Sequence, residues 1–341
     1  MPGPWVRRAL TIPLMFFASV TLIALTPVIL IFSALYDLAG RRRWACSRLV
    51  LALCWFAFFH LWGFSVALVQ GVLTCSGRVG GDRLERWSAW LQNVWVLSLF
   101  AGVRKVTGFQ LVEENRDVVP STGPMLLFLR HASAVDTLLP VVLISGPLRL
   151  SPRYVVKTEL KWDPVFDVIG QRMRNIFVVR GSSDPAREIA NVRTLAEDLD
   201  ARSVVVIYPE GTRRTPERRA RILDKMRARS DARLAYSEAL QHTLPPKHGG
   251  PLALMDAAER ADIVICGHVG FDDAFDIADV MNGSLIGKKV FVRYWHFPSS
   301  EVPRDEVGRA AWLDARWRDL DAWVASVSGA THQAERHLQD V

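Results

Sequence analysis

The chain has few cysteines and no arrangement of them that would hold together a disulfide-based or zinc-based fold. Only four occur among 341 residues, and no Cys-x-x-Cys pair is present. Cys46, Cys54 and Cys75 lie in or beside apolar segments, and Cys266 lies in an apolar run typical of a strand. Internal repeats and low-complexity tracts are also lacking, and a hydrophobic content of 50% excludes global disorder. This cysteine usage excludes a small disulfide scaffold and fits a reducing compartment or lipid.

Charge is absent from two long stretches, although the whole chain carries 42 Lys and Arg against 35 Asp and Glu, a net charge of +7. No charged residue occurs from Ala9 to Tyr36, and none occurs from Leu49 to Gly77 when His60 is taken as neutral. Each run exceeds the roughly 20 residues that cross a bilayer core. The first run is also much longer than the about 7–15 apolar residues of a secretory signal. We therefore expect residues 1–78 to form a retained, membrane-anchoring helical hairpin.

The arginines around these runs leave the orientation of the hairpin open. Four of them, Arg41, Arg42, Arg43 and Arg48, lie in the linker between the runs. If both runs span the bilayer, the positive-inside rule places this linker in the cytoplasm and the larger C-terminal part outside. The arginines before the first run and after the second nearly equal those of the linker in number, so the rule decides little. A hairpin that enters only one leaflet would leave the linker and the C-terminal part on the same side. We expect an integral membrane protein with a cytoplasmic catalytic domain.

Residues 79–106 connect the hairpin to the rest of the chain and have mixed character. Within 87–103, tryptophans and aliphatic residues stand beside polar residues such as Gln92 and Asn93. Because tryptophan favours the membrane–water interface, an interfacial amphipathic helix is one interpretation. A core helix of the following domain is the other, and the sequence alone does not decide between them.

Short apolar runs typical of strands recur after Thr107 and alternate with stretches typical of helices. This alternation predicts an α/β domain over residues 107–341, with a central mixed or mostly parallel sheet flanked by helices. The last stretch, 304–339, has apolar residues at near-helical spacing and predicts an amphipathic helix that packs on the domain. The predicted strands are Met125–Leu129, Tyr154–Val156, Ile176–Val179, Ser203–Tyr208, Asp262–Cys266 and Val290–Tyr294, and helices are predicted over Pro185–Asp200 and Pro216–Leu240.

Three polar residues, His131, Ser133 and Asp136, follow the predicted strand at Met125–Leu129. Open α/β sheets bind ligands beyond the carboxyl ends of their strands. A strand-end histidine and an aspartate in the next helical turn can meet there, so that the carboxylate fixes the imidazole tautomer and leaves the other nitrogen as a general base. The alternative is that His131 is a satisfied polar residue and that Asp136 only favours a helix N-terminus.

Two further strand ends carry cationic groups. Tyr208–Arg214 combines a glycine turn with arginines, which suits a phosphate, although a charged surface turn is the alternative. Asn175–Gly181 is another apolar run, and it ends in Arg180. The three strand ends together supply a base and two cationic groups, and this agreement favours a single catalytic site over separate surface turns.

Three motifs occupy these strand ends: His131-x4-Asp136, Phe177-Val-Val-Arg180 and Pro209-Glu-Gly-Thr-Arg213. In this order and spacing the chain resembles the glycerolipid acyltransferases, which include the 1-acyl-glycerol-3-phosphate and related lysophospholipid acyltransferases. The likeness runs from Leu111 to Asp273. Further local likenesses point to the lysocardiolipin-acyltransferase-like branch: Lys157-Thr-Glu159-Leu160, the long insert after Arg213, and Leu244-Pro-Pro-Lys-His-Gly249.

The resemblance implies that acyl-CoA, or an acyl carrier protein thioester, donates a fatty acyl chain to a lysophospholipid hydroxyl, converting lysophosphatidic acid to phosphatidic acid. It implies that His131 removes the hydroxyl proton during direct attack on the thioester, that Asp136 orients His131, and that no cofactor is needed. His242, His248 and His268 lack a metal-like spacing, so no metal is expected. Membrane lipids are the expected partners, and nucleic acid is not. The positions associated with the acceptor phosphate match Arg180, Glu210, Gly211, Thr212 and Arg213, with Lys157 as a weaker addition.

Two features depart from the family pattern. Many members have asparagine before the motif histidine, where this chain has Arg130, and the segment 263–270 lacks a proline that often follows an apolar strand there. The acceptor therefore stays open, with lysophosphatidylinositol, lysophosphatidylglycerol or lysocardiolipin as alternatives to lysophosphatidic acid. A non-catalytic lipid-binding membrane protein is the alternative of another class. Ser133 as the nucleophile of a hydrolase is disfavoured because the chain has no Gly-x-Ser-x-Gly motif.

Overall fold

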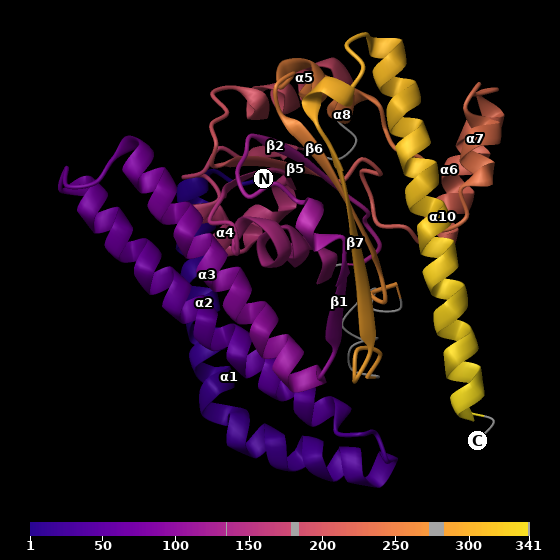
Figure 1. Cartoon of the computed structure of the whole chain (residues 1–341). Coiled ribbons are helices and arrows are strands. Elements are labelled where there is room, and N and C mark those ends of the chain that lie inside the picture. The colour runs from indigo at the N-terminus through magenta and orange to yellow at the C-terminus, as the bar shows by residue number, and fades with distance from the viewer. Residues whose placement is uncertain (134, 179–183, 273–282, 340–341) are drawn as a thin grey trace.

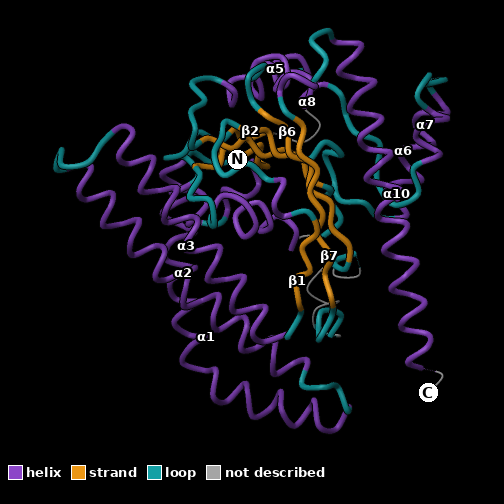
Figure 2. The backbone as a smooth tube through the Cα atoms, viewed as in Figure 1, coloured by secondary structure: helices purple, strands orange, loops and turns teal. Residues whose placement is uncertain are grey.

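The computed structural model describes residues 1–133, 135–178, 184–272 and 283–339 (Figure 1). Three long helices, α1 (Pro4–Gly40), α2 (Ala45–Cys75) and α3 (Gly81–Thr107), lead into a domain built around a sheet, and α10 (Glu306–Gln339) follows its last strand. Figure 2 shows the first three helices together on one flank of the strands and α10 on the opposite flank. The shorter helices are α4 (Pro164–Ile169), α5 (Pro185–Arg193), α6 (Pro216–Ala228), α7 (Leu234–Ala239) and α8 (Gly249–Ala257).

The sheet has seven described strands: β1 (Gln110–Glu114), β2 (Met125–Leu129), β3 (Ser151–Lys157), β4 (Ile176–Val178), β5 (Ser203–Ile207), β6 (Asp262–Val269) and β7 (Lys289–Phe297). Their order across the sheet is β1-β7-β6-β2-β5-β3-β4. The pairs from β6 to β4 are parallel, whereas β7 runs antiparallel to β6, and β1 runs parallel to β7. The predicted fold class, a mixed and mostly parallel sheet flanked by helices, is confirmed.

Alternate side chains of β2 serve two separate hydrophobic cores. Leu126 and Phe128 pack into the core covered by α5, α8 and α10. Met125, Leu127 and Leu129 pack into the core on the other face, to which α3 contributes. This is the period-two alternation of a strand whose faces are both covered, and it explains why β2 reads as a continuous apolar run. The carboxyl end of β2 is therefore placed by packing on both sides.

The predicted strands are present in the part of the chain that the structure describes, with ends that shift by a few residues. β1 is an additional strand that the sequence does not predict, because only two of its five residues, Leu111 and Val112, are apolar. The helix predicted over Pro216–Leu240 is two helices, α6 and α7, because the backbone at Ser230 turns through the left-handed region with a φ of 50°. The helix predicted over Pro185–Asp200 ends as α5 at Arg193 and continues only as a short 3-10 turn.

α3 packs as a core helix along one of its faces. Leu91, Trp95 and Leu99 are buried in a cluster shared with α2 and α4. The Asn93 amide nitrogen donates to the Leu150 carbonyl at 3.3 Å, which ties the middle of α3 to the start of β3. The core interpretation of this segment thus accounts for its polar residues, while the opposite face, which includes Trp90, stays exposed.

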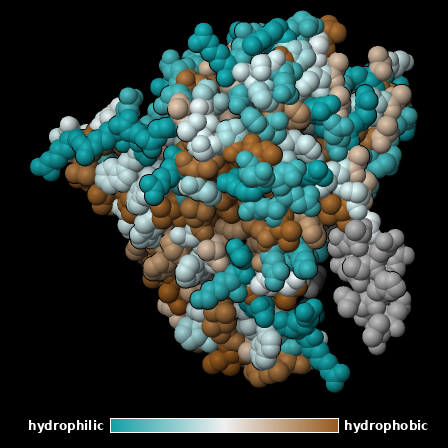
Figure 3. Space-filling model, in the orientation of Figure 1, coloured by the Kyte–Doolittle hydropathy of each residue, from teal (hydrophilic) through white to brown (hydrophobic). Residues whose placement is uncertain are grey.

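α1 and α2 are long and apolar enough to cross a membrane, judged by length and composition. Their turn is fixed by Asp37, whose carboxylate accepts the N–H groups of Cys46 at 3.1 Å and Ser47 at 2.8 Å. Many large apolar side chains on both helices are exposed. Figure 3 shows hydrophobic side chains gathered over the lower part of one face, where the first three helices lie. Such a surface is compatible with membrane association.

Candidate active site

The parallel strands bring their carboxyl ends to one edge of the sheet. β2 is followed by His131, β5 by the turn Tyr208–Arg214, and β3 ends at Lys157. Because β5 lies between β2 and β3, these groups stand on neighbouring strand ends. This edge is where open α/β sheets bind their ligands.

His131 and Asp136 meet at this edge, as the sequence predicts. Nδ1 of His131 lies 2.9 Å from Oδ1 of Asp136, and the Asp136 side chain is fully buried. Asp136 stands in a short 3-10 helix, Val135–Leu138, and its Oδ2 accepts the N–H groups of Ala132 at 2.6 Å and Ser133 at 2.7 Å. The carboxylate is thus built into the loop that carries the histidine.

The environment keeps Asp136 ionised. Burial alone would raise the pKa of Asp136, but hydrogen bonds from His131 and His268 hold it well below its usual range. A charged Asp136 keeps the His131 proton on Nδ1. Nε2, on the far side of the ring, has no hydrogen bond to any residue that the structure describes, and 8% of the side chain is exposed. This nitrogen can therefore accept a proton from a bound molecule.

The turn after β5 packs directly against the histidine. The Tyr208 ring lies 4.6 Å from the His131 ring, centroid to centroid, and its hydroxyl donates to the Asp136 carbonyl at 3.1 Å. Glu210 accepts the His131 N–H at 3.2 Å with Oε1 and the Leu244 N–H at 3.1 Å with Oε2. Burial raises the pKa of Glu210 to about 8, against the pull of a neighbouring guanidinium and these N–H groups. The two oxygens of the Glu210 side chain thus tie the main chain at His131 to the main chain at Leu244.

The next residues form a cationic turn. Gly211 has a φ of +66°, a conformation that other residues rarely adopt, and a Cβ there would lie 2.9 Å from the Lys247 ammonium nitrogen. Lys247 reaches this turn because its own N–H donates to the Pro209 carbonyl at 2.8 Å. Thr212 and Arg213 follow and are half-buried. Lys247 is a cation beside this turn that the sequence did not assign a role.

Lys157, another of the predicted cations, lies at the same edge of the sheet. Lys157 is the last residue of β3, and it pairs in register with Val178 of β4. The predicted residue Arg180 follows two positions after Val178 and lies outside the described residues.

Arg130, at the position where the resemblance leads us to expect asparagine, is fully buried at the end of β2. Its guanidinium donates to the carbonyls of His268 at 2.7 Å and His242 at 2.9 Å, and it forms an ion pair with Asp272. Burial would raise the pKa of Asp272, but this guanidinium lowers it to about 2. The departure from the family pattern is therefore part of an internal network that joins three segments.

A second histidine reaches Asp136 from β6. Nε2 of the fully buried His268 lies 3.3 Å from Asp136 Oδ2 and 3.2 Å from the Arg130 carbonyl oxygen. Leu129 of β2 pairs with Cys266 of β6, so His268 stands level with the residues that follow β2. No sequence pattern connects His268 with Asp136, because their contact depends on this strand pairing.

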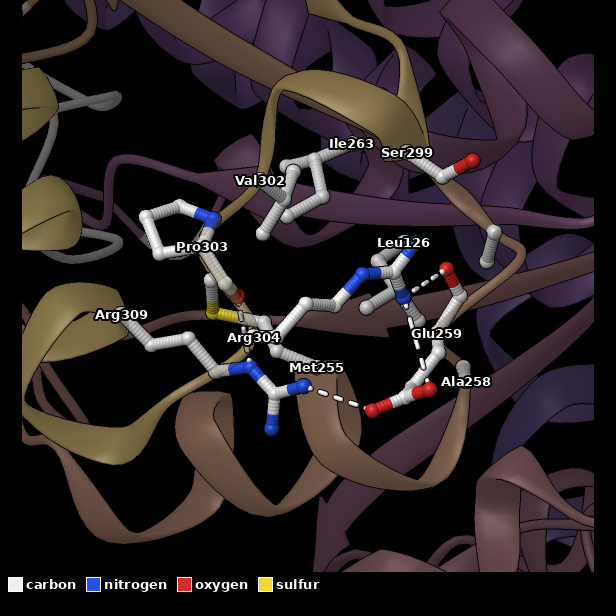
Figure 4. Close-up of a pocket in the computed structure, with 11 residues that line it drawn as sticks. Leu126, Met255, Ala258, Glu259, Ile263, Ser299, Val302, Pro303, Arg304 and Arg309 are labelled. Carbon is white, nitrogen blue, oxygen red and sulfur yellow. Dashed lines mark hydrogen bonds and ion pairs between the residues drawn. The ribbon is translucent and has the colours of Figure 1, made fainter.

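A cavity of about 700 Å³ lies between α2 and α3, and the residues that line it include Leu51, Trp55 and Lys105. Among the described residues, no group of three or more His, Cys, Asp and Glu side chains is placed to hold a metal ion. The cavity in Figure 4, lined by Leu126 and Ile263, has a volume of about 10 Å³, room for about one water. Glu259 pairs beside it with Arg304 and Arg309. This small cavity lies near the amino ends of β2 and β6, away from the edge of the sheet that carries His131.

Comparison with known proteins finds a similarity over the stretch of the chain that contains these residues. Residues 110–270 match the family model described as Acyltransferase. Among solved structures, the chain is similar to the crystal structure of the 1-acyl-sn-glycerophosphate (LPA) acyltransferase, PlsC, from Thermotoga maritima, with a TM-score of 0.47 and 12% sequence identity. The similarity covers 80% of this chain and 95% of that one. The stretch that matches the family contains His131, Asp136, the Tyr208–Arg214 turn and His268.

Proposed function

We propose that the chain, whose residues 110–270 match the family model described as Acyltransferase, is a membrane-bound O-acyltransferase of lysophospholipids. The proposed donor is acyl-CoA or an acyl carrier protein thioester. The proposed acceptor is lysophosphatidic acid, which becomes phosphatidic acid. The observation that carries this proposal is the buried His131–Asp136 pair, joined at 2.9 Å, with the second ring nitrogen turned away from the carboxylate. A protein that only bound lipids would need no general base there.

In the proposed reaction, Nε2 of His131 takes the proton of the acceptor hydroxyl while that oxygen attacks the thioester carbonyl carbon. An ester C–O bond forms and the thioester C–S bond breaks. The proton then passes from the imidazolium to the departing thiolate. The ionised Asp136 stabilises the imidazolium between these two transfers. Because the attack is direct, no side chain of the enzyme is acylated.

The cationic strand ends are the proposed site for the acceptor phosphate. Arg213 offers a guanidinium suited to two phosphate oxygens, and Lys247 and Lys157 add positive charge at the same edge. Gly211 and Thr212 shape the turn that carries Arg213, and Arg180 keeps its predicted role in phosphate binding. Glu210 contributes by holding the His131 strand end, since both of its oxygens accept main-chain N–H groups. Fixing the phosphate would bring the acceptor hydroxyl to His131 in a reactive position.

The acceptor is tested with purified protein in detergent, a labelled acyl-CoA and a panel of lysophospholipids. We expect labelled phosphatidic acid from lysophosphatidic acid at a rate at least about tenfold above that of any diester acceptor. The phosphomonoester carries more negative charge than a diester and so gains more from a cationic edge. The product is identified by chromatography, and an acyl carrier protein thioester is run in parallel as donor.

Two results would overturn this assignment. Faster product formation from lysophosphatidylinositol, lysophosphatidylglycerol or lysocardiolipin would make the protein a remodelling acyltransferase. No product with any acceptor and either donor would favour a lipid-binding protein that retains the fold.

Both ends of α2 contact the α/β domain, which bears on how the hairpin sits in the membrane. Near the C-terminal end, the Gln70 side chain accepts a hydrogen bond from Arg172 at 3.0 Å. At the N-terminal end, the Ala45 Cβ lies 3.7 Å from the point that a Cβ on Gly283 would occupy. At ~1.5 Å per residue the helix is about 45 Å long, so it lies along the domain. If the hairpin spanned the bilayer, the turn between α1 and α2 would lie on the far side of a hydrocarbon core about 30 Å thick, away from the domain.

We infer that the hairpin is embedded from one side of the bilayer and does not cross it. The start of α1 also contacts this domain, since Arg8 Nε lies 2.9 Å from the buried Asp167 carboxylate. For the test, Arg43→Cys in the turn and Arg78→Cys after α2 are made singly in a chain without native cysteines, with Lys225→Cys on α6 as the reference for the domain. An impermeant thiol reagent should label all three from the same side of sealed vesicles. Labelling of Arg43→Cys only from the opposite side would establish a spanning hairpin.

A further inference from the structure

His268 and His131 bind different oxygens of one carboxylate. His131 Nδ1 lies 2.9 Å from Asp136 Oδ1, and His268 Nε2 lies 3.3 Å from Asp136 Oδ2. His268 and Asp136 are both fully buried. We propose that His268 is a positioning residue that acts through Asp136 on the His131 base, an inference that rests on the proposed acyl transfer.

The surroundings of His268 fix where its proton lies. Nε2 also lies 3.2 Å from the Arg130 carbonyl oxygen, which can only accept, so Nε2 carries the hydrogen. Nδ1 is buried and has no hydrogen-bond partner among the described residues. A second proton there would be an unsatisfied buried donor, which is costly. His268 is therefore a neutral imidazole whose Nε2–H is shared between the Arg130 carbonyl and Asp136.

This donor completes the hydrogen bonding of the Asp136 carboxylate. The carboxylate accepts from His131, from His268, and from the N–H groups of Ala132 and Ser133. Each hydrogen bond to the carboxylate partly neutralises its negative charge. It thereby weakens the electrostatic attraction between Asp136 and the proton that His131 gains during catalysis. The effect is strong because the group lies in a region of low dielectric constant. His268 thus weakens the hold of Asp136 on the proton of His131, and it fixes the rotamer of Asp136.

Other titratable and charged groups face the same carboxylate and histidines, and they stay in place when His268 is changed. They come from the end of β2, the turn after β5, and β6 with the residues that follow it. They are Arg130, Tyr208, Glu210, Arg214, Cys266 and Asp272.

The proposal is tested with the full-length protein carrying His268→Leu, which removes the donor, and His268→Gln, which places an amide N–H near the position of Nε2. Without the donor, Asp136 holds the His131 proton more strongly, and the base becomes neutral only at higher pH. We expect the acid limb of the kcat profile of His268→Leu to move upward by about one pH unit. Its plateau kcat should fall severalfold, while KM for both substrates stays unchanged. His268→Gln should restore most of the wild-type profile.

The outcomes separate a positioning role from a structural one. A folded His268→Leu protein with the wild-type acid limb would overturn the proposal, as would equal shifts in the Leu and Gln variants. If the wild-type protein shows no acyl transfer at all, the proposed function fails. In that case ¹⁵N resonances of the His131 ring, followed against pH in all three proteins, still test whether His268 acts on His131. If the pH midpoint of the ¹⁵N transition moves upward in His268→Leu alone, the action of His268 on His131 is supported. If the midpoints are identical in all three proteins, it is refuted.

Discussion

Replacing His131 by alanine should reduce acyl transfer by about 10³-fold, within the range that a general base contributes. The variant keeps the acceptor-binding cations but has no group that can take the hydroxyl proton, so the loss should fall on kcat with KM changed little. Asp136 retains its two main-chain donors and His268, so the protein should still fold. The measurement is the initial rate with saturating acyl-CoA and lysophosphatidic acid, together with the melting temperature in detergent.

The chain offers a matched control for this variant. His296 also binds an aspartate, with Nε2 2.9 Å from Asp262 Oδ2, but this pair lies at the opposite edge of the sheet. His296→Ala removes the same type of side chain and a similar hydrogen bond, and its rate should stay within about twofold of the wild type because the pair lies at the opposite edge of the sheet from His131. A folded His131→Ala protein that keeps full turnover would refute the base assignment.

Replacing Arg130 by asparagine, the residue that the resemblance leads us to expect there, should destabilise this chain. Arg130 is fully buried, and its removal leaves Asp272 without its ion partner and two carbonyls, those of His242 and His268, without a donor. Breaking a buried ion pair by removing one partner costs about 3 kcal/mol or more. We expect a clear fall in the melting temperature and loss of activity through loss of the folded protein.

The control for this prediction is an exposed ion pair of the same chemistry. Arg193 and Asp256 are paired with about half of each side chain exposed, so Arg193→Asn should cost under about 1 kcal/mol. The double variant Arg130→Asn with Asp272→Asn should be more stable than Arg130→Asn alone, because it no longer buries an unpaired carboxylate. Wild-type stability of Arg130→Asn would show that the network around Arg130 is dispensable.

Local patterns in the sequence predicted the sheet strands and the His131–Asp136 pair for understandable reasons. β2 and β5 are continuous apolar runs because both of their faces are covered, and such runs are visible without any knowledge of the fold. His131 and Asp136 are close in the chain and are joined within one tight turn, so spacing and residue type were enough to pair them.

The features that the sequence missed depend on contacts between distant segments. His268 meets Asp136 only because β6 lies beside β2, and Lys247 reaches Gly211 only because its main chain bonds to Pro209. In the sequence, Arg130 stood out only because the resemblance leads us to expect asparagine there. Its partners come from distant segments, namely Asp272, which follows β6, and the carbonyl of His242. None of these pairings leaves a periodic or compositional signal.

The order of strands in the sheet sets the order in which this protein can mature on the ribosome. β1 is the first strand of the described sheet to be synthesised, and its neighbour β7 is the last. At about 5–20 residues per second, the apolar helices emerge many seconds before β7. An anchor formed by α1 and α2, as proposed above, would therefore reach the bilayer while the sheet is still incomplete, and the domain would finish folding on a membrane-tethered nascent chain. His268, on β6, joins Asp136 only near the end of translation, so the proposed catalytic edge would be assembled beside the bilayer that holds the proposed lipid substrates.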